Sequence, residues 1–222
     1  EFIKKMSREE ILENLSRSGA ILKLLPTEFK SDKEMCLAAV TSSGTVLKLV
    51  SDDLKEDFGI CFAAVSSRGL ALFQAKNKAP EIYLAAVKQD GMVLREVHKQ
   101  TREICLEAVK QNGNALKFVK LQDEEICLAA VEQRGRALRM VIDRTDKICM
   151  AAVKTQGSAL KYVRNQTEEI CFAAVEKDPY SLKWSRKQTE EMCLAAVKKN
   201  KSVLKFVYKD FREACERFLE HE

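Results

Sequence analysis

The chain has 222 residues, 46% of them hydrophobic, which is enough for a large folded domain or a repeat array. It holds only 8 Gly and 3 Pro, so an all-β fold and disorder are both disfavoured, because each relies on residues that turn or break the chain. Lys and Arg number 38 against 33 Asp and Glu, and the net charge of +5 permits a polyanionic partner without requiring one.

The N-terminal segment carries no signal-peptide pattern, and no apolar run approaches the roughly 18 residues of a membrane helix. We therefore expect no membrane span and a cytoplasmic protein, with export that leaves no N-terminal mark as the open alternative. Glu1 and Phe2 resemble a cloning scar, so residues 1–6 are expected to form a tail before the folded domain.

After this tail, one pattern recurs to the end of the chain. Residues 103–109 read Glu-Ile-Cys-Leu-Glu-Ala-Val and return at 125–131 with one change. The period is 22 residues, Tyr83 replaces Cys in one repeat, and three extra residues occur in each of 26–32 and 51–57. All eight cysteines occupy the same repeat position: Cys36, Cys61, Cys105, Cys127, Cys149, Cys171, Cys193 and Cys215. A period of about 20–50 residues indicates a repeat architecture such as a solenoid.

Each repeat predicts two short helices. The first begins after a residue four places before the Cys position, where a side chain that can cap a helix almost always stands. These residues are Ser7, Asp32, Asp57, Thr101, Asp123, Thr145, Thr167 and Thr189, with Ala79 as the exception. Most repeats place a Gly after the first helix, where we expect the left-handed backbone of a helix C-cap. The second helix is shorter, as at 114–120.

The middle of the first helix, as at 126–131, is apolar nearly all round and needs cover on more than one side. Stacked neighbouring repeats supply that cover. The terminal helices, at 8–16 and 211–220, instead have one apolar and one charged face, as solvent-facing caps require. The sequence therefore predicts an all-α solenoid of about nine two-helix repeats of 22–25 residues, with polar capping helices, in one domain over 7–220.

This pattern resembles the helical repeats of domain-of-unknown-function family 4116, whose motif is similar to Glu-Ile-hydrophobic-Leu-Ala-Ala-Val, three residues, Gly, two residues and Leu-Lys-aromatic-Val. Agreement is best at 103–119, 125–140 and 147–163. The resemblance implies an α-solenoid, and because the family carries no assigned activity it implies no catalytic residue. Pro179 and Lys201 stand where the motif has Gly, so we expect a distorted turn between the two helices of those repeats.

The cysteine spacing argues against a metal site and against disulfides. A zinc site needs Cys pairs roughly two to four residues apart, whereas the shortest gap here is 22 residues. Cysteines one repeat apart would be separated by a helix layer, beyond the ~5.5 Å between Cα atoms that a disulfide spans. We interpret all eight as reduced thiols of the repeat core, which implies a reducing compartment. We predict no metal and no other cofactor.

A basic residue recurs one place after the Leu of the second helix. The members of this basic ladder are Lys23, Lys48, Arg95, Lys117, Arg139, Lys161, Lys183 and Lys205, with Phe73 as the interruption. Such a column is a candidate binding site for a phosphate backbone or an acidic partner. Alternatively, the cations interact favourably with the dipole at a helix C-terminus, or they form ion pairs with an acidic residue of the next helix, for example Lys117 with Glu125. We favour this second interpretation, because the small net charge leaves little surplus for a polyanion.

Aromatic residues follow the ladder by one place. They are Phe118, Tyr162, Trp184 and Phe206. Bases of a single strand could stack on them, but Leu49 and Met140 fill the same position, which favours a role in the core.

No catalytic constellation is evident in the sequence. His98 and His221 have no nucleophile or metal-ligand motif around them, and no phosphate-binding Gly loop occurs. Departures from the repeat, at 73–76, at Tyr83 and at 178–184, are further candidates for function, although we favour repeat decay as their cause.

We expect a non-enzymatic scaffold for protein–protein interaction, because solenoids vary exposed residues over a constant core. One exposed place changes charge between repeats, at Lys88, Lys110, Glu132, Lys154, Glu176 and Lys198. The alternative is nucleic-acid binding along the basic ladder. A third possibility is a targeting module of a larger effector or viral protein, in a host cytosol or a virion. These patterns set neither the partner nor the oligomeric state.

Overall fold

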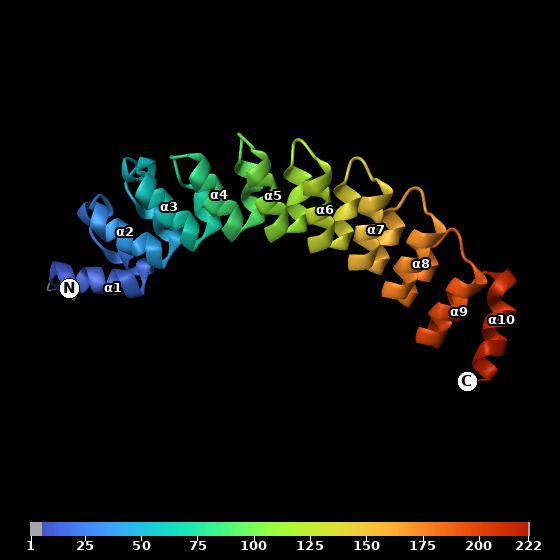
Figure 1. Ribbon diagram of the computed structural model, residues 1–222. Coiled ribbons are helices and arrows are strands. Elements are labelled where there is room, and N and C mark those ends of the chain that lie inside the picture. The colour runs from blue at the N-terminus through green and yellow to red at the C-terminus, as the bar shows by residue number, and fades with distance from the viewer. Residues whose placement is uncertain (1–5, 222) are drawn as a thin grey trace. The chain divides into compact units, whose positions relative to one another are not determined.

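The computed structural model describes residues 6–221, along which α-helices alternate with short 3-10 helices and no strand occurs (Figure 1). The predicted all-α solenoid of two-helix repeats is confirmed, since successive helices pack in chain order. The tail predicted over 1–6 lies, apart from Met6, outside the described residues. The chain divides into two compact units, unit 1 up to Gln111 and unit 2 from Asn112. The single domain over 7–220 stays a prediction.

Unit 1 holds the first repeats. Its helices are α1 (Arg8–Arg17), η2 (Gly19–Leu24), η3 (Thr27–Lys30), α2 (Lys33–Ser42), η4 (Gly44–Leu49), η5 (Leu54–Glu56), α3 (Phe58–Ser67), η6 (Gly69–Phe73), α4 (Pro80–Gln89), η7 (Gly91–Glu96) and α5 (Arg102–Gln111). The extra residues of the first two junctions form η3 and η5.

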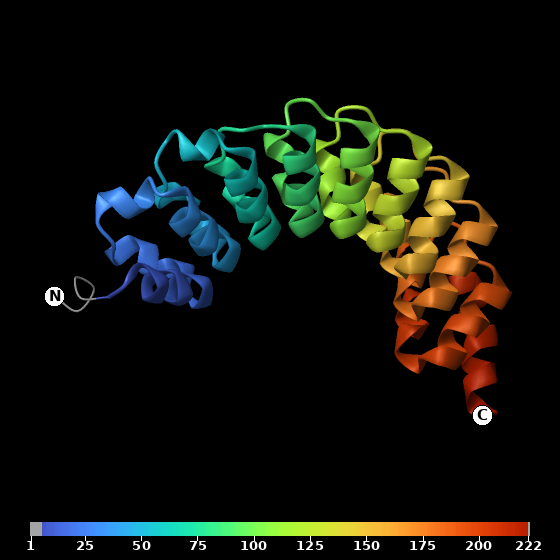
Figure 2. The same cartoon turned by 60° about the vertical axis from the view of Figure 1, so that its left-hand side comes forward.

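Unit 2 holds the more regular repeats. Its helices are η8 (Gly113–Phe118), α6 (Glu124–Gln133), η9 (Gly135–Met140), α7 (Asp146–Thr155), η10 (Gly157–Tyr162), α8 (Glu168–Lys177), η11 (Pro179–Trp184), α9 (Glu190–Lys199), η12 (Lys201–Phe206) and α10 (Lys209–Glu220). Helices α6 to α10 lie side by side in chain order, and η8 to η12 form a second row packed on them (Figure 2).

The predicted helix starts are confirmed. Asp123 Oδ1 accepts a hydrogen bond from Ile126 N at 2.8 Å, and the capping hydroxyl of Thr189 accepts one from Met192 N at 3.3 Å. Each bond satisfies one of the backbone N–H groups that the first turn leaves without a helical partner. Ala79 makes no side-chain cap, and Pro80 begins α4 instead, where its missing N–H costs nothing.

The second helix of each repeat is a 3-10 helix rather than an α-helix. In η8, Gly113 and Leu116 are buried, and Val119 directly after the helix is buried too. These three residues are spaced by three, which is the number of residues per turn of a 3-10 helix, so they line one side. The spacing of Gly, Leu and Val in the motif therefore indicates a 3-10 helix.

The expected left-handed glycine at the end of the first helix is wrong. No described residue has a positive φ, and the residue before the Gly, such as Arg134 with φ −153° and ψ 105°, is extended and ends the α-helix. The Gly is needed for close packing. A Cβ at Gly135 would lie 2.5 Å from the carbonyl oxygen of Ala152, one repeat further on, and 2.7 Å from Gln156 Cβ. Gly therefore lets each 3-10 helix start against the backbone of the next α-helix.

The distorted turns expected at Pro179 and Lys201 are also wrong. The preceding residues, Asp178 (φ −150°, ψ 108°) and Asn200 (φ −156°, ψ 105°), have the same extended backbone as Gln156 (φ −148°, ψ 105°). Each makes its own turn, because Asp178 Oδ1 accepts from Tyr180 N at 3.0 Å and Asn200 Oδ1 from Ser202 N at 2.9 Å. The turn therefore depends on the extended residue and not on Gly, and Gln156 forms it without a side-chain cap.

A buried glutamine ties successive repeats together, and sequence reasoning missed it. Gln166 Nε2 donates to Leu160 O at 3.2 Å and to Trp184 O at 3.0 Å, which belong to successive 3-10 helices. Its Oε1 accepts from Arg186 N at 2.8 Å and from the Cys171 thiol at 3.5 Å. One side chain thus satisfies polar groups of two repeats. Gln188 makes the equivalent four bonds one repeat later.

The terminal helices are the predicted caps. In α1 only Ile11 and Leu15 are buried, and in α10 only Cys215. Each packs on a single neighbouring α-helix, α2 or α9, so its other side meets solvent and carries the charged residues.

Two glycine substitutions should separate packing from helix propensity. Gly135→Ala places a Cβ 2.5 Å from a backbone oxygen, so we expect a loss of about 1–3 kcal/mol in the free energy of unfolding. Gly59→Ala is the control, because its Cβ would meet only Asp57 Oδ1 at 3.2 Å inside α3, and it should be neutral or stabilise by up to ~1 kcal/mol. Urea unfolding followed by circular dichroism measures both. Equal effects of the two variants would contradict the close-packing role.

The glutamine tie is tested by replacing Gln166. Gln166→Ala removes the hydrogen bonds to Leu160 O and Trp184 O and from Arg186 N, the last two of them part-buried, so we expect a loss of roughly 1–3 kcal/mol. Gln166→Arg should keep more of the stability, because Arg144 at the equivalent position donates to Leu138 O at 3.0 Å and to Tyr162 O at 3.3 Å. Thermal unfolding compares the variants, and an alanine variant as stable as the parent protein would refute the tie.

Candidate functional site

The cysteines lie in the interior of both units. All eight are buried as thiols. Burial raises the pKa of Cys127 to about 11 and of Cys193 to about 12, so both stay protonated at neutral pH. Within the described residues, no three His, Cys, Asp or Glu side chains converge where they could hold a metal ion. The Cys column therefore packs the core and offers no nucleophile to solvent.

The other singled-out residues are divided between core and surface. Tyr83 is buried in the Cys position of α4, where its ring fills the core. His98 and His221 are exposed. In unit 1 the ladder residues Lys23, Lys48 and Arg95 are exposed in η2, η4 and η7.

Arg95 shows how the ladder of unit 1 is held. Its guanidinium lies 4.9 Å from the ring centroid of Phe73, the residue that interrupts the column, and its Nε lies 3.4 Å from Glu96 Oε1.

In unit 2 the ladder lies over aromatic rings. Lys161 Nζ is 4.7 Å from the Tyr162 ring centroid and 5.7 Å from that of Trp184. Lys183 Nζ is 4.9 Å from the Trp184 centroid, so this indole has a cation from each of two repeats. These are cation–π distances. The hydrogen bond from Lys161 lowers the pKa of Tyr162.

The ladder of unit 2 is not neutralised by acidic side chains. None of its five cations forms an ion pair within the described part of the chain, and Lys117 lies 4.6 Å from the Phe118 centroid rather than beside Glu125. The aromatic rings are partly exposed to solvent. Trp184, for example, is 38% exposed, and the ammonium groups of Lys161 and Lys183 lie over its ring. The ladder is therefore a row of ring-supported positive charges.

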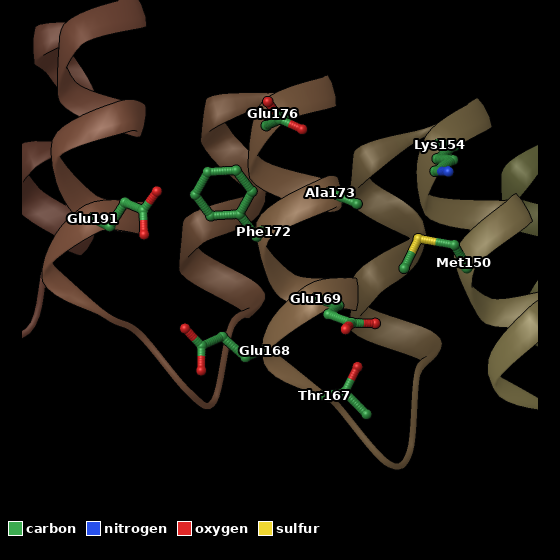
Figure 3. Close-up of a pocket in the computed structure, with 9 residues that line it drawn as sticks. All are labelled: Met150, Lys154, Thr167, Glu168, Glu169, Phe172, Ala173, Glu176 and Glu191. Atoms are coloured by element: carbon green, nitrogen blue, oxygen red, sulfur yellow. The ribbon is translucent and has the colours of Figure 1, made fainter.

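A groove of about 810 Å³ lies on the α-helix side of unit 2. Apolar groups in it come from Met150 of α7 and from Phe172 and Ala173 of α8 (Figure 3). The other lining residues are Lys154, Thr167, Glu168, Glu169, Glu176 and Glu191. Figure 3 shows the phenyl ring of Phe172 projecting toward the side on which Glu191 of α9 lies. The groove therefore combines an apolar surface with four carboxylates and one ammonium group.

The groove extends from α7 and α8 to the side of α9, where the repeat loses its Gly. A Cβ at Gly157 would lie 2.5 Å from Ala174 O, so η10 and α8 come together as closely as Gly allows. Pro179 stands at the equivalent place of the next repeat and has a Cβ there. Helices α8 and α9 contact each other over a shorter stretch than the other adjacent α-helices of unit 2. The exchange of Gly for Pro therefore coincides with looser packing of α8 on α9.

One hydrogen bond still joins α8 and α9. Lys199 Nζ donates to Glu176 O at 2.8 Å. This bond uses the backbone carbonyl of Glu176, so the carboxylate remains at the rim of the groove.

The chain is an α-helical repeat protein of the solenoid class, because its two-helix repeats stack in chain order around a core that contains the Cys column. Every helix in the described range is too short or too polar to span a bilayer. A family model described as Domain of unknown function (DUF4116) matches residues 7–55, 80–122, 101–145 and 167–212. These matches cover well over half of the sequence, and the chain belongs to this family. Comparisons with curated proteins and with solved structures each found no match.

Buried, protonated thiols should react slowly. We expect iodoacetamide at pH 8 to label the eight cysteines of the folded protein at least roughly 100-fold more slowly than in urea, because labelling requires thiolate and access. Mass spectrometry counts the adducts over time. Rapid labelling of several cysteines in the folded protein would contradict their place in the core.

Proposed function

We propose that this protein is a non-enzymatic scaffold that binds another protein through the α-helix side of unit 2. The observation that carries the proposal is the groove, in which an apolar surface and charged side chains lie together and open to solvent. Protein partners use such a combination, with apolar anchors at the centre and polar groups at the rim. The thiols, the strongest potential nucleophiles of the chain, are buried, which supports a binding role rather than catalysis.

The distribution of variation between repeats supports the same proposal. In unit 2 the buried Ile-Cys and Ala-Val positions of α6 to α8 do not change. The exposed position five after the Cys alternates in charge, at Glu132, Lys154, Glu176 and Lys198. A solenoid that recognises one partner keeps its core and varies such positions.

We also infer an intracellular, reducing setting for the protein. Eight thiols in one chain without a disulfide are typical of such a compartment.

Nucleic-acid binding is the second candidate, and the ladder of unit 2 favours it. Its cations form no ion pair within the described residues, so their charge is available to a polyanion. The ring faces are less available, because Lys161 and Lys183 already lie over Trp184, and stacked bases would have to displace them. This arrangement makes the α-helix side the stronger candidate.

Site-specific photo-crosslinking separates the two functions. A benzoylphenylalanine in place of Phe172 reports on the groove, and one in place of Tyr162 reports on the ladder. In an extract of the native cells we expect protein adducts at position 172 that resist nuclease. Adducts at position 162 alone, and sensitive to nuclease, would overturn the proposal.

A salt titration with a labelled single strand serves as the control for this experiment. Five lysine or arginine contacts to phosphates would weaken binding roughly 100-fold between about 50 and 200 mM salt. We expect no such binding. A steep loss of affinity over this range would instead establish the nucleic-acid function.

A further inference from the structure

We propose that the groove between α7, α8 and α9 binds a positively charged segment of the partner, with a Lys or Arg side chain over the Phe172 ring and apolar side chains on Met150 and Ala173. This inference rests on the proposed function and gives its partner a chemistry. It follows from the charge of the groove, from the ring in it and from the spacing of the helices around it.

The carboxylates of the groove are not neutralised by the protein itself. Within the described residues, none of the four lining glutamates, Glu168, Glu169, Glu176 and Glu191, forms an ion pair, and Lys154 is the one cation among the lining residues. Carboxylates beside an apolar surface attract a cation more strongly than carboxylates in open solvent do. The groove therefore selects against an acidic segment and against a phosphate backbone.

Within the described residues, the starts of α8 and α9 lack an ion pair that the starts of α6 and α7 have. There Lys147 Nζ lies 3.2 Å from Glu124 Oε2 and joins the starts of the two helices. Glu168 stands at the place of Glu124 in its repeat, and Glu191 stands at the place of Lys147. Glu191 is the usual residue at this place, as Glu125 and Glu169 are, and Lys147 is the exception. Glu168 and Glu191 are therefore two like charges, which a cation from a partner would bridge.

The aromatic ring gives the cation a defined place. Phe172 is partly exposed, and it takes the position that Leu128 and Leu194 hold in other repeats of unit 2. A guanidinium or ammonium group over a phenyl ring is stabilised by the ring's quadrupole. Inside unit 2 the lysines of the ladder already use aromatic rings in this way, as Lys183 does with Trp184.

The separation of α8 from α9 provides the room. Helices α8 and α9 contact each other less extensively than α7 and α8 do, and Pro179 stands where Gly157 makes the close contact of the preceding repeat. Phe172 of α8 therefore lies beside the less closely packed interval. Restoring Gly at position 179 should therefore narrow the groove.

The test uses two 12-residue fluorescein-labelled peptides with leucines at the same helical positions, one with four arginines and the other with four glutamates. Fluorescence anisotropy with the full chain measures both affinities. We expect the arginine peptide to bind at least about tenfold more tightly than its acidic twin. Equal affinities, or preference for the acidic twin, would overturn the inference.

Three charge substitutions then locate the binding. Glu176→Lys and Glu191→Lys reproduce residues that the chain already has at the equivalent positions, Lys198 and Lys147, so the fold should tolerate them. Together they should weaken the arginine peptide about tenfold or more. Glu132→Lys is the matched control for each single substitution, since it makes the same charge change on α6 outside the groove, and it should change the affinity less than about twofold. An equal effect of the control would show attraction to net charge alone and would overturn the inference.

Pro179→Gly tests the spacing without altering any charge. We expect weaker binding of the arginine peptide with an unchanged far-UV circular-dichroism spectrum, because Gly permits the close contact of the other repeats. Unchanged binding would contradict the role of the wider interval. Protein adducts at position 172 together with no preference for the arginine peptide would sink this inference and leave the proposed scaffold function standing.

Discussion

The close contact between a glycine and the backbone of the next repeat governs the structure. In seven repeats the 3-10 helix begins at a Gly whose Cα lies against the carbonyl of an Ala in the following α-helix, and a side chain there would collide with it. This contact fixes how near one repeat stands to the next. It also accounts for the paired alanines of the motif, because the second Ala supplies the carbonyl and is fully buried, as at Ala130 and Ala152. Polar ties, of which Gln166 is the clearest, then satisfy the carbonyls where two 3-10 helices end.

The function that we propose follows from the place where this constraint is relaxed. Pro179 removes the contact without changing the turn, since Asp178 keeps the extended backbone of its counterparts. The result is a local change in helix spacing rather than a break in the array. The surface beside this place is acidic, because Glu168 and Glu191 are like charges where Glu124 and Lys147 form an ion pair between α6 and α7. A repeat protein can thus combine a local change in helix spacing with an acidic surface and leave its core intact.

The sequence predicted those features that depend on one repeat at a time. Capping residues such as Asp123 and Thr189, the buried Cys column and the polar terminal helices all follow from local pattern. The helix type of the second element was predictable too, since Gly113, Leu116 and Val119 are spaced by three, but a C-cap interpretation of the Gly obscured it.

Features that join repeats were not predictable in this way. A Gln at the position of Gln166 recurs with the same period as the Cys. Nothing in the repeat of Gln166 itself shows that its side chain contacts Trp184 of the next repeat. The groove depends on side chains from three helices and on the distance between them, so no single repeat contains its pattern. The ladder was found from its spacing, but its contact with aromatic rings in place of acids depends on packing.

A crystal structure of the protein with Pro179→Gly, compared with that of the parent chain, shows whether the glycine contact sets the spacing of the repeats. We expect the separation between the axes of α8 and α9 to fall to the separation between α7 and α8. If α8 and α9 keep the same separation in both crystals, the glycine contact does not set the spacing of the repeats.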